Sequence, residues 1–341
     1  MPVHPSVVKK YASKGWDVLI DNTLLTDWPS AELGDVFVDT TQVIQQSDIL
    51  AAYAPDEDWV QQLPSNKVLV SLLAPFQDRT WTNQLLDRGV QPFSLDMIPR
   101  TSRAQSMDVL SSMASIAGYK AVLLGAAHLP KYFPMMITAA GSVRPSKVLV
   151  IGAGVAGLQA IATARRLGAV VEAFDTRAAV KEEVQSLGAK FVEVEGAKDE
   201  ASAGGYAVEQ SEDYKQRQQA LVKEKAAEAD VVITTAQVRG RKAPLILPKA
   251  TVESMKPGSV IVDLAASTGG NCEVTQDNAT INHQGVTVIG DSNLANSVPI
   301  VASELFANNV FNFVQLFINE EGQFHIDFDD DIIAASLLKP E

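Results

Sequence analysis

The 341-residue chain has ordinary globular composition, with 46% hydrophobic and 20% charged residues. This excludes collagen-like, low-complexity and largely disordered proteins, and the length favours two domains at about 150 residues each. The formal net charge of −13 argues against a nucleic-acid partner, because binding a phosphate backbone would have to overcome net repulsion.

The cysteine content and the lengths of the apolar runs indicate the cellular compartment. The one cysteine, Cys272, excludes an internal disulfide framework and fits a reducing compartment. The start, MPVHPSVVKKY, lacks the apolar core of a secretory signal. The best candidate for a membrane span, Ala121 to Ala140, is interrupted by two prolines, a histidine and a lysine. We therefore expect a cytoplasmic chain with no direct membrane insertion.

The first hundred residues predict an α/β series of short apolar strands separated by helices. The strands are expected near Val18–Asp21, Asp48–Tyr53, Val68–Leu72 and Pro92–Leu95, and two of the helices at Ser6–Ser13 and Thr82–Asp87. A long helix, roughly Arg103 to Ala127, follows. One face of it carries small residues suited to close packing, either within the chain or against a second copy.

From Lys147 onward, short apolar runs alternate with longer amphipathic stretches, which is typical of βαβ units and a parallel sheet. Six strands are expected, at Lys147–Ile151, Val170–Phe174, Lys190–Val194, Val231–Thr235, Val260–Leu264 and Val286–Ile289. The helix between the first two, Val155–Leu167, stops at Gly168. This pattern predicts a doubly wound nucleotide-binding domain.

A Phe-rich helix, Val298 to Ile318, is expected to return the chain to the first domain. The sequence therefore predicts an α/β protein of two Rossmann-like, doubly wound parallel-sheet domains with a cleft between them. The first domain comprises residues 1–125 plus 305–341, and the nucleotide-binding Rossmann domain comprises 126–304.

The segment KVLVIGAGVAGLQA places Gly152, Gly154 and Gly157 in a G-x-G-x-x-G at a strand-to-helix turn. The first glycine makes the tight turn, the second admits a pyrophosphate, and the third lets the helix pack on the strand. The helix N-terminus offers free N–H groups and partial positive charge to phosphates. The alternative is a Rossmann-like turn that has lost its ligand.

Asp175 ends the next strand, 23 residues after Gly152, where a carboxylate can accept hydrogen bonds from the adenosine ribose. It would repel a 2′-phosphate, so the sequence favours NAD(H) over NADP(H), although Arg177 stands two residues further on. The long polar loop that follows, Gly196–Asp213, is interpreted either as a glycine-hinged lid with Tyr206 at its tip or as a flexible insertion.

Five stretches together carry a family resemblance: PRTSRAQSMDVLSS, GAGVAGLQAIATARRLGA, AFDTRA, AGGYA and the VDLA…GGNC run. The chain resembles the NAD(H)-binding domain I, carried on the alpha subunit, of proton-translocating NAD(P) transhydrogenase, in the alanine dehydrogenase/transhydrogenase family. The resemblance covers nearly the whole chain.

The resemblance implies a nicotinamide-side site in the Pro99–Ser112 stretch. Gln105 and Asp108 would position the ring without acid–base chemistry. The cofactor-binding residues implied there are Arg100, Thr101, Ser102, Arg103, Gln105, Asp108 and Ser111. Gln105, Asp108 and Ser111 have the spacing of one helix face. The alternative is a capped helix start, with Ser102 as N-cap and Gln105 completing a capping box.

The resemblance also implies an adenosine side, made of Val155, Asp175, Thr176, Arg177, Gly205, Tyr206, Gln218 and Gln237, beside the three fingerprint glycines. The family usually has leucine where this chain has Gln237. Its Pro-Gly-Lys-Pro turn is replaced here by the basic Arg239–Lys242 turn, interpreted either as a docking or affinity feature or as a solvated loop.

The resemblance implies the Si/Re-specific, proton-translocating transhydrogenase reaction, with NAD(H) as cofactor. Hydride would pass from NADH to NADP⁺ on a separate domain III of a beta subunit, with membrane domain II as a further partner. The chain would form a homodimer. Its partner subunits would hold it at the surface of the inner membrane. No general base is needed, because hydride passes directly between two nicotinamide rings.

Two alternatives remain. A soluble alanine-type dehydrogenase would need a histidine after the Val68–Leu72 strand, where this chain reads LLAPFQD. A non-catalytic NAD-binding regulatory subunit is the other. His325 and the aspartates at 327 and 329–331 are expected at a solvated strand end rather than in a metal site, and Cys272 is expected to be a buried small residue.

Overall fold

The computed structural model describes residues 4–24, 36–194, 212–319 and 321–340. The chain divides into two compact units: unit 1 comprises Met1–Met113 with Val298–Glu341, and unit 2 comprises Ala114–Ser297. The domain boundaries proposed from the sequence, 125/126 and 304/305, fall inside the helices α5 (Val109–His128) and α10 (Pro299–Val314).

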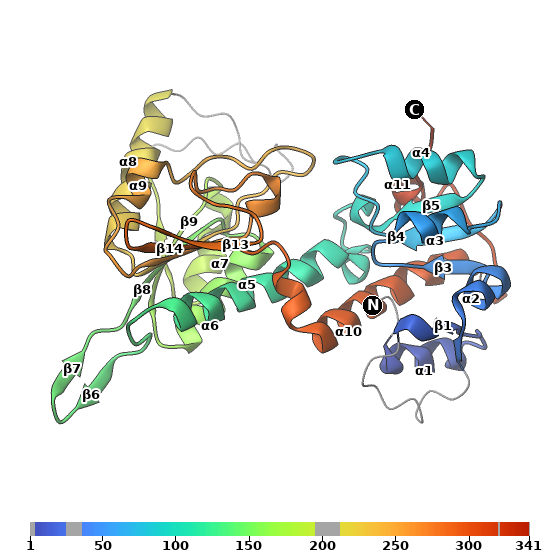
Figure 1. Ribbon diagram of the computed structural model, residues 1–341, viewed down its shortest axis with the longest axis horizontal. Coiled ribbons are helices and arrows are strands. Elements are labelled where there is room, and N and C mark those ends of the chain that lie inside the picture. Colours follow the sequence, from blue (N-terminus) through green and yellow to red (C-terminus); the bar gives the residue numbers. More distant parts are fainter. Residues whose placement is uncertain (1–3, 25–35, 195–211, 320, 341) are drawn as a thin grey trace. The chain divides into compact units, whose positions relative to one another are not determined.

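Unit 2 is built on a seven-stranded sheet of order β10-β9-β8-β11-β12-β14-β13 (Figure 1). Its strands are β8 (Lys147–Ile151), β9 (Val170–Phe174), β10 (Lys190–Val192), β11 (Val231–Thr234), β12 (Val260–Asp263), β13 (Ala279–His283) and β14 (Val286–Gly290). All neighbours are parallel except β13 and β14. The strand order reverses between β8 and β11, as in a doubly wound fold, so the predicted fold class is confirmed.

Helices cover both faces of this sheet. They are α6 (Val155–Arg166), α7 (Lys181–Ser186), α8 (Glu212–Glu228), α9 (Lys249–Val252) and α5 from Ala114 onward. Alternate residues of β8 enter two different cores. Val148 and Val150 pack with α5 and α6, whereas Leu149 and Ile151 pack with α8 and α9. Burial of both faces explains why the strands are nearly continuous apolar runs.

The small-residue face of α5 is used inside the chain. A Cβ on Gly118 would lie 2.1 Å from the carbonyl oxygen of Ala156 on α6, so α5 and α6 pack backbone to backbone. In the part of the chain that the structure describes, α5 is also the one helix long and apolar enough to cross a membrane, and a third of its apolar window is buried. This is weak evidence for a span, because the core helix of a soluble protein passes the same test.

Unit 1 contains two smaller parallel sheets. One is the pair β1 (Ile20–Asp21) and β2 (Phe37–Val38), and the other is the sheet β3 (Ile49–Ala51), β4 (Val68–Ser71) and β5 (Gln91–Ser94). The helices are α1 (Pro5–Ser13), α2 (Thr40–Gln46), α3 (Glu57–Gln61), α4 (Thr80–Asp87), α10 and α11 (Asp331–Ser336). Phe313 and Phe317, near the end of α10, pack on Phe93 of β5.

A hairpin of β6 (Met136–Thr138) and β7 (Gly141–Val143) extends away from the seven-stranded sheet of unit 2 (Figure 1). Its residue Ile137 is 75% exposed, and Tyr132 and Met135, just before it, are exposed as well. An apolar surface of this kind on a projecting element is typical of a protein contact.

Candidate functional site

The glycine turn joins β8 to α6. Gly152 has φ +102, and a Cβ there would lie 2.4 Å from the Thr235 hydroxyl. A Cβ on Gly157 would lie 1.8 Å from the carbonyl oxygen of Gly152. Around Gly154, in contrast, a Cβ would meet no described atom within 4 Å. Two glycines are therefore required by the fold, and the third leaves open space at the surface.

That open space lies at the N-terminus of α6. Gly154 is the N-cap residue, and no side chain of the described residues hydrogen-bonds to the start of this helix. The uncapped N–H groups and the helix dipole form an anion-binding position. It sits at the carboxyl ends of β8 and β11, where the strand order reverses and where ligands bind in open α/β sheets.

Asp175 follows β9 at the same edge. Its Oδ2 accepts a hydrogen bond of 2.7 Å from the Ala153 amide, and both oxygens accept hydrogen bonds from Arg177. Burial raises the pKa of Asp175, but these hydrogen bonds lower it more, so the pKa lies below its usual value. The carboxylate is thus charged at neutral pH and tied to the glycine turn.

The ends of β11 and β12 complete this edge through a buried polar network. The Thr235 hydroxyl donates to the Gly152 carbonyl at 3.0 Å. Asn271, fully buried, accepts from the Ala236 amide at 3.0 Å and donates to the Ala236 carbonyl at 2.8 Å. The Asp263 carboxylate accepts a hydrogen bond of 2.8 Å from the backbone amide of Asn271. The network fixes the segment after β11 beside the glycine turn.

In unit 1, the polar stretch before α5 differs from the sequence prediction. The helix begins at Val109 and not near Arg103, and a short 3-10 helix, Gln105–Met107, precedes it. Asp108 caps α5 by accepting from the Ser111 amide at 2.9 Å and from its hydroxyl at 2.6 Å. The Ser102 cap and the shared helix face with Gln105 are therefore wrong, because Asp108 satisfies the first-turn donors instead.

Exposed polar side chains remain on this stretch. Arg100 and Gln105 are exposed, and their side chains form no hydrogen bond or ion pair with any residue that the structure describes. Arg103 instead pairs with Asp330 and Asp331. Asp330 is the N-cap of α11, so the predicted strand end at this acidic cluster is wrong.

Comparison with known proteins identifies the family. The model described as alanine dehydrogenase/PNT, N-terminal domain, matches residues 1–117, and the one described as alanine dehydrogenase/PNT, C-terminal domain, matches residues 121–340. The chain belongs to the alanine dehydrogenase/PNT family. The family resemblance seen in the sequence is confirmed.

Relatives that are 40–42% identical to this chain are named as transhydrogenase alpha subunits. The chain is 42% identical over 337 residues to NAD(P) transhydrogenase subunit alpha of Haemophilus influenzae, covering 96% of this chain and 66% of that one. The chain thus spans about two thirds of the length of that relative. It is 40% identical over 335 residues to the first portion of NAD(P) transhydrogenase subunit alpha of Rhodospirillum rubrum, covering 94% and 87%. The transhydrogenase structure from Sinorhizobium meliloti matches with a TM-score of 0.89 at 37% identity, covering 99% and 93%.

The predicted adenosine-side residues are only partly brought together. The fingerprint glycines, Val155, Asp175 and Arg177 gather around the turn between β8 and α6. Thr176 is exposed beside Asp175, and Gln218 is half-buried on α8. Gln237 donates to the Leu264 carbonyl at 2.7 Å. Gly205 and Tyr206 lie outside the described residues.

Sequence reasoning assigned no role to Thr235, Asp263 and Asn271. A signal existed for two of them, because Asp263 and Asn271 belong to the VDLA…GGNC run. Asp263 ends a fully buried strand, where a lone carboxylate must find donors. The predicted burial of Cys272 in the same run is confirmed, since it is 1% exposed.

Proposed function

We propose that this chain is the NAD(H)-binding component of a proton-translocating NAD(P) transhydrogenase and delivers hydride from NADH to NADP⁺ held by a partner domain. The observation that carries the proposal is the open space at Gly154, beside the uncapped N-terminus of α6. A pyrophosphate fits this position by charge and by room. The proposal is also supported by the 40–42% identity to transhydrogenase alpha subunits.

The residues present fit NAD(H). Gly154 and the first amides of α6 would hold the pyrophosphate, and the Asp175 carboxylate would accept the adenosine ribose hydroxyls. Arg100 and Gln105, whose side chains have no partner among the described residues, would hold the nicotinamide carboxamide. The hydrogen bond from the Ser111 hydroxyl to the Asp108 carboxylate would fix the start of α5, which follows Gln105 in the chain. Bound NADH supplies the hydride.

Direct transfer between two dinucleotides needs orientation and no proton acceptor. The segment after β4, Leu72–Asp78, holds no histidine, whereas an alanine-type dehydrogenase needs one there for acid–base work. Catalysis by this chain would then rest on placing the nicotinamide C4 atom at a reactive distance from its acceptor. The soluble dehydrogenase is the second candidate, and a non-catalytic NAD-binding subunit is the third.

The proposed partners are a membrane domain II, an NADP(H)-binding domain III and a second copy of this chain at the cytoplasmic face of the membrane. The homodimer is supported by the exposed apolar residues of the β6–β7 hairpin, Ile137 above all. Sedimentation should give twice the chain mass for the wild type and a monomer for Ile137→Asp. A monomeric wild type would remove the homodimer from the proposal.

The reaction can be tested with the purified chain, a purified NADP(H)-binding domain of a transhydrogenase, and NADH in which both C4 hydrogens are replaced by deuterium. We expect deuterium to appear in NADPH without exchange with water. Deuterium-free NADPH would exclude direct transfer. Rapid NADH formation from alanine and NAD⁺ would favour the dehydrogenase, and NADH binding with no NADPH formed would favour the regulatory subunit.

A further inference from the structure

The stretch Arg100–Asp108 has little regular structure of its own. Its internal backbone hydrogen bonds are single turns. The Ala104 amide donates to the Thr101 carbonyl at 3.1 Å, the Met107 amide to the Ala104 carbonyl at 2.9 Å, and the Asp108 amide to the Gln105 carbonyl at 3.4 Å. Isolated turns of this kind open easily in water. If Arg100 and Gln105 are to orient a ring, other parts of unit 1 must hold the stretch in place.

Two anchors come from burial and from α10. Ala104 and Met107, at 1% and 6% exposure, enter the core that contains Ile332 and Ile333 of α11. The Ser106 carbonyl accepts two side-chain hydrogen bonds from α10, at 2.8 Å from Asn309 and 3.0 Å from Asn312. These contacts fix the middle of the stretch but not its first half.

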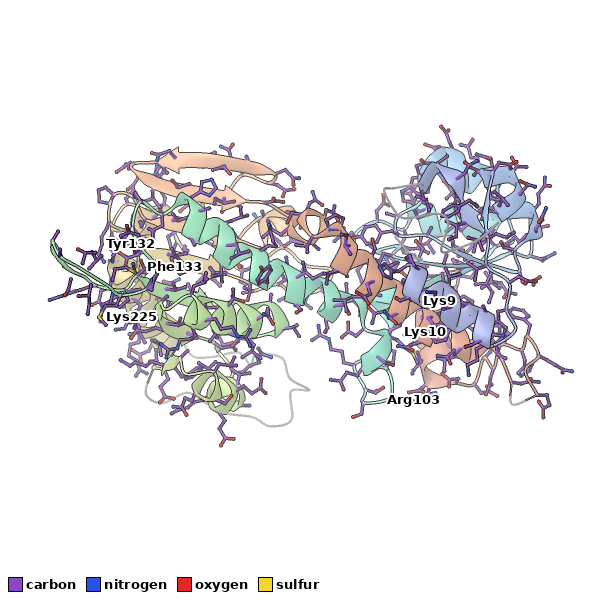
Figure 2. All side chains as sticks on the ribbon, turned by 90° about the horizontal axis from the view of Figure 1, so that it is seen from below. Lys9, Lys10, Arg103, Tyr132, Phe133 and Lys225 are labelled. Atoms are coloured by element: carbon purple, nitrogen blue, oxygen red, sulfur yellow. The ribbon has the colours of Figure 1, made fainter. Side chains whose placement is uncertain are left out.

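Arg103 supplies the anchor for the first half. Its Nη1 donates to Asp330 Oδ2 at 2.6 Å and its Nη2 to Asp331 Oδ1. Asp330 caps α11 at the same time, because its Oδ1 accepts from the amides of Ile332 and Ile333 at 2.9 and 3.1 Å. Figure 2 labels Arg103 on the segment that leads into α5. One guanidinium thus ties the stretch to the C-terminal helix, 227 residues away.

We propose that Arg103 is a positioning residue that holds Arg100 and Gln105 in place through Asp330 and Asp331, and that it does not touch the dinucleotide. This rests on the proposed function and departs from the expectation that Arg103 binds cofactor. Both amino nitrogens of its guanidinium are engaged by carboxylates. Reaching a phosphate would leave Asp330 without its cation. Arg100 is therefore the arginine of this stretch that meets the ligand.

The pairing of Arg103 with two carboxylates also explains why this position carries an arginine and not a lysine. A planar guanidinium can bind two separate carboxylates in a fork, whereas a lysine ammonium presents a single charged point. The hydrogen bond from Arg103 keeps the pKa of Asp330 below its usual value, so the pair is charged at neutral pH. We therefore expect Arg103→Lys to retain only some of the anchoring.

Two measurements on the full chain test the assignment, and neither requires hydride transfer. The first is amide hydrogen exchange of peptides covering residues 100–108, where Arg103→Gln should speed exchange about five- to tenfold. The second is the affinity for ADP-ribose, a probe that carries the adenosine, ribose and pyrophosphate but no nicotinamide. Since only a contact with those groups would alter it, ADP-ribose affinity should stay within about twofold.

Matched variants make the result specific. Asp330→Asn keeps a good N-cap for α11 but removes the charge, and it should speed exchange like Arg103→Gln. The charge swap Arg103→Asp with Asp331→Arg should restore slow exchange. Lys9→Gln, which removes an exposed cation of α1, should change neither measurement (Figure 2).

Unchanged exchange in Arg103→Gln, or a charge swap that restores nothing, would overturn the proposal. So would a tenfold loss of ADP-ribose affinity in Arg103→Gln that Asp330→Asn does not share, because that pattern marks a direct phosphate contact. A wild-type chain that binds no ADP-ribose would defeat the proposed function instead, and the exchange data would still decide the role of Arg103.

Discussion

The carboxylate of Asp175 and the guanidinium of Arg177 form two side-chain hydrogen bonds, of 3.0 Å from Nε and 2.9 Å from Nη2. The Arg177 and Ala153 amides donate to the same carboxylate at 2.8 and 2.7 Å. A carboxylate has about four acceptor positions, so all are occupied. A ribose hydroxyl can bind Asp175 only if a donor leaves, and the side chain of Arg177 is the one that can move.

Arg177 is therefore expected to oppose NADH binding while favouring a 2′-phosphate. Replacing it in Arg177→Met should leave the NADH dissociation constant unchanged or lower, and should raise the preference for NADH over NADPH about tenfold, as expected for loss of a charged hydrogen bond. Asp175→Ala should weaken NADH binding about 10- to 100-fold. Fluorescence titration measures both. If Arg177→Met weakened NADH as much as Asp175→Ala does, Arg177 would be a ligand residue.

Another ion pair, between Lys131 and Asp230, lies at the amino end of β11 and is expected to contribute to stability. Asp230 Oδ2 accepts hydrogen bonds of 2.8 Å from Lys131 Nζ and from the Lys147 amide. Burial raises the pKa of Asp230, but these donors lower it more, so the net pKa lies below its usual value. A carboxyl group with a depressed pKa stabilises the fold above the unfolded pKa, about 3.9, and this stabilisation is lost as the pH falls through the folded value.

Asp230→Asn should lower the free energy of unfolding at pH 7 by about 1–3 kcal/mol, because it weakens two hydrogen bonds at a largely buried group. The difference from wild type should shrink as the pH falls below about 4. Urea unfolding at several pH values measures this. Asp213→Asn, in the exposed pair with Arg217, is the control and should change stability by less than about 0.5 kcal/mol. A difference that grows in acid would contradict the assignment.

The sequence predicted the centre of unit 2 well, since β8 and β9 begin and end at the residues expected. Their apolar runs enter the cores on both faces of the sheet, and a glycine or polar residue lies within two positions of each end, so the signal is local. β13 was missed because two of its five residues are exposed and none is buried. Its hairpin turn is also Gln284-Gly285, both with positive φ, instead of a recognisable Asn-Gly.

Longer-range features could not be predicted from local patterns. The sequence suggested Ser102 as the helix cap, whereas Asp108 caps α5 in the structure. Ala104 and Met107 are buried in the core of unit 1, and residues 100–107 stay outside the helix. The pairing of Arg103 with Asp330 joins residues 227 positions apart and leaves no periodic signal in the sequence. The polar residues of the candidate site could be recognised from sequence motifs. Tertiary contacts decide which of their side chains are paired within the protein and which can meet a ligand.

Backbone strain after β4 provides a stability test. Ala74 has φ +45, a left-handed conformation that costs a residue with a side chain about 1 kcal/mol or more, and its carbonyl accepts from the Gln77 amide at 2.8 Å. Ala74→Gly should therefore raise the free energy of unfolding by about 0.5–1 kcal/mol. Ala220→Gly, at an exposed position of α8, should lower it by about 1 kcal/mol. If both substitutions destabilise the chain equally, Ala74 carries no strain.

The fingerprint glycines separate folding from ligand binding. A Cβ at Gly154 would meet no described atom within 4 Å, so Gly154→Ala should change stability by no more than about 0.5 kcal/mol. A Cβ at Gly157 would lie 1.8 Å from the Gly152 carbonyl, so Gly157→Ala should destabilise by about 1–3 kcal/mol despite the better helix propensity of alanine.

Both substitutions should weaken NADH binding by about tenfold or more, because the pyrophosphate needs the space at Gly154 and the close approach of α6 that Gly157 allows. Thermal unfolding and NADH titration of the two variants, side by side, separate the effects. Only Gly154→Ala should combine a wild-type Tm with lost affinity. If it bound NADH as tightly as the wild type, the open space at this turn would not be where the dinucleotide binds, and the proposed function would lose its main support.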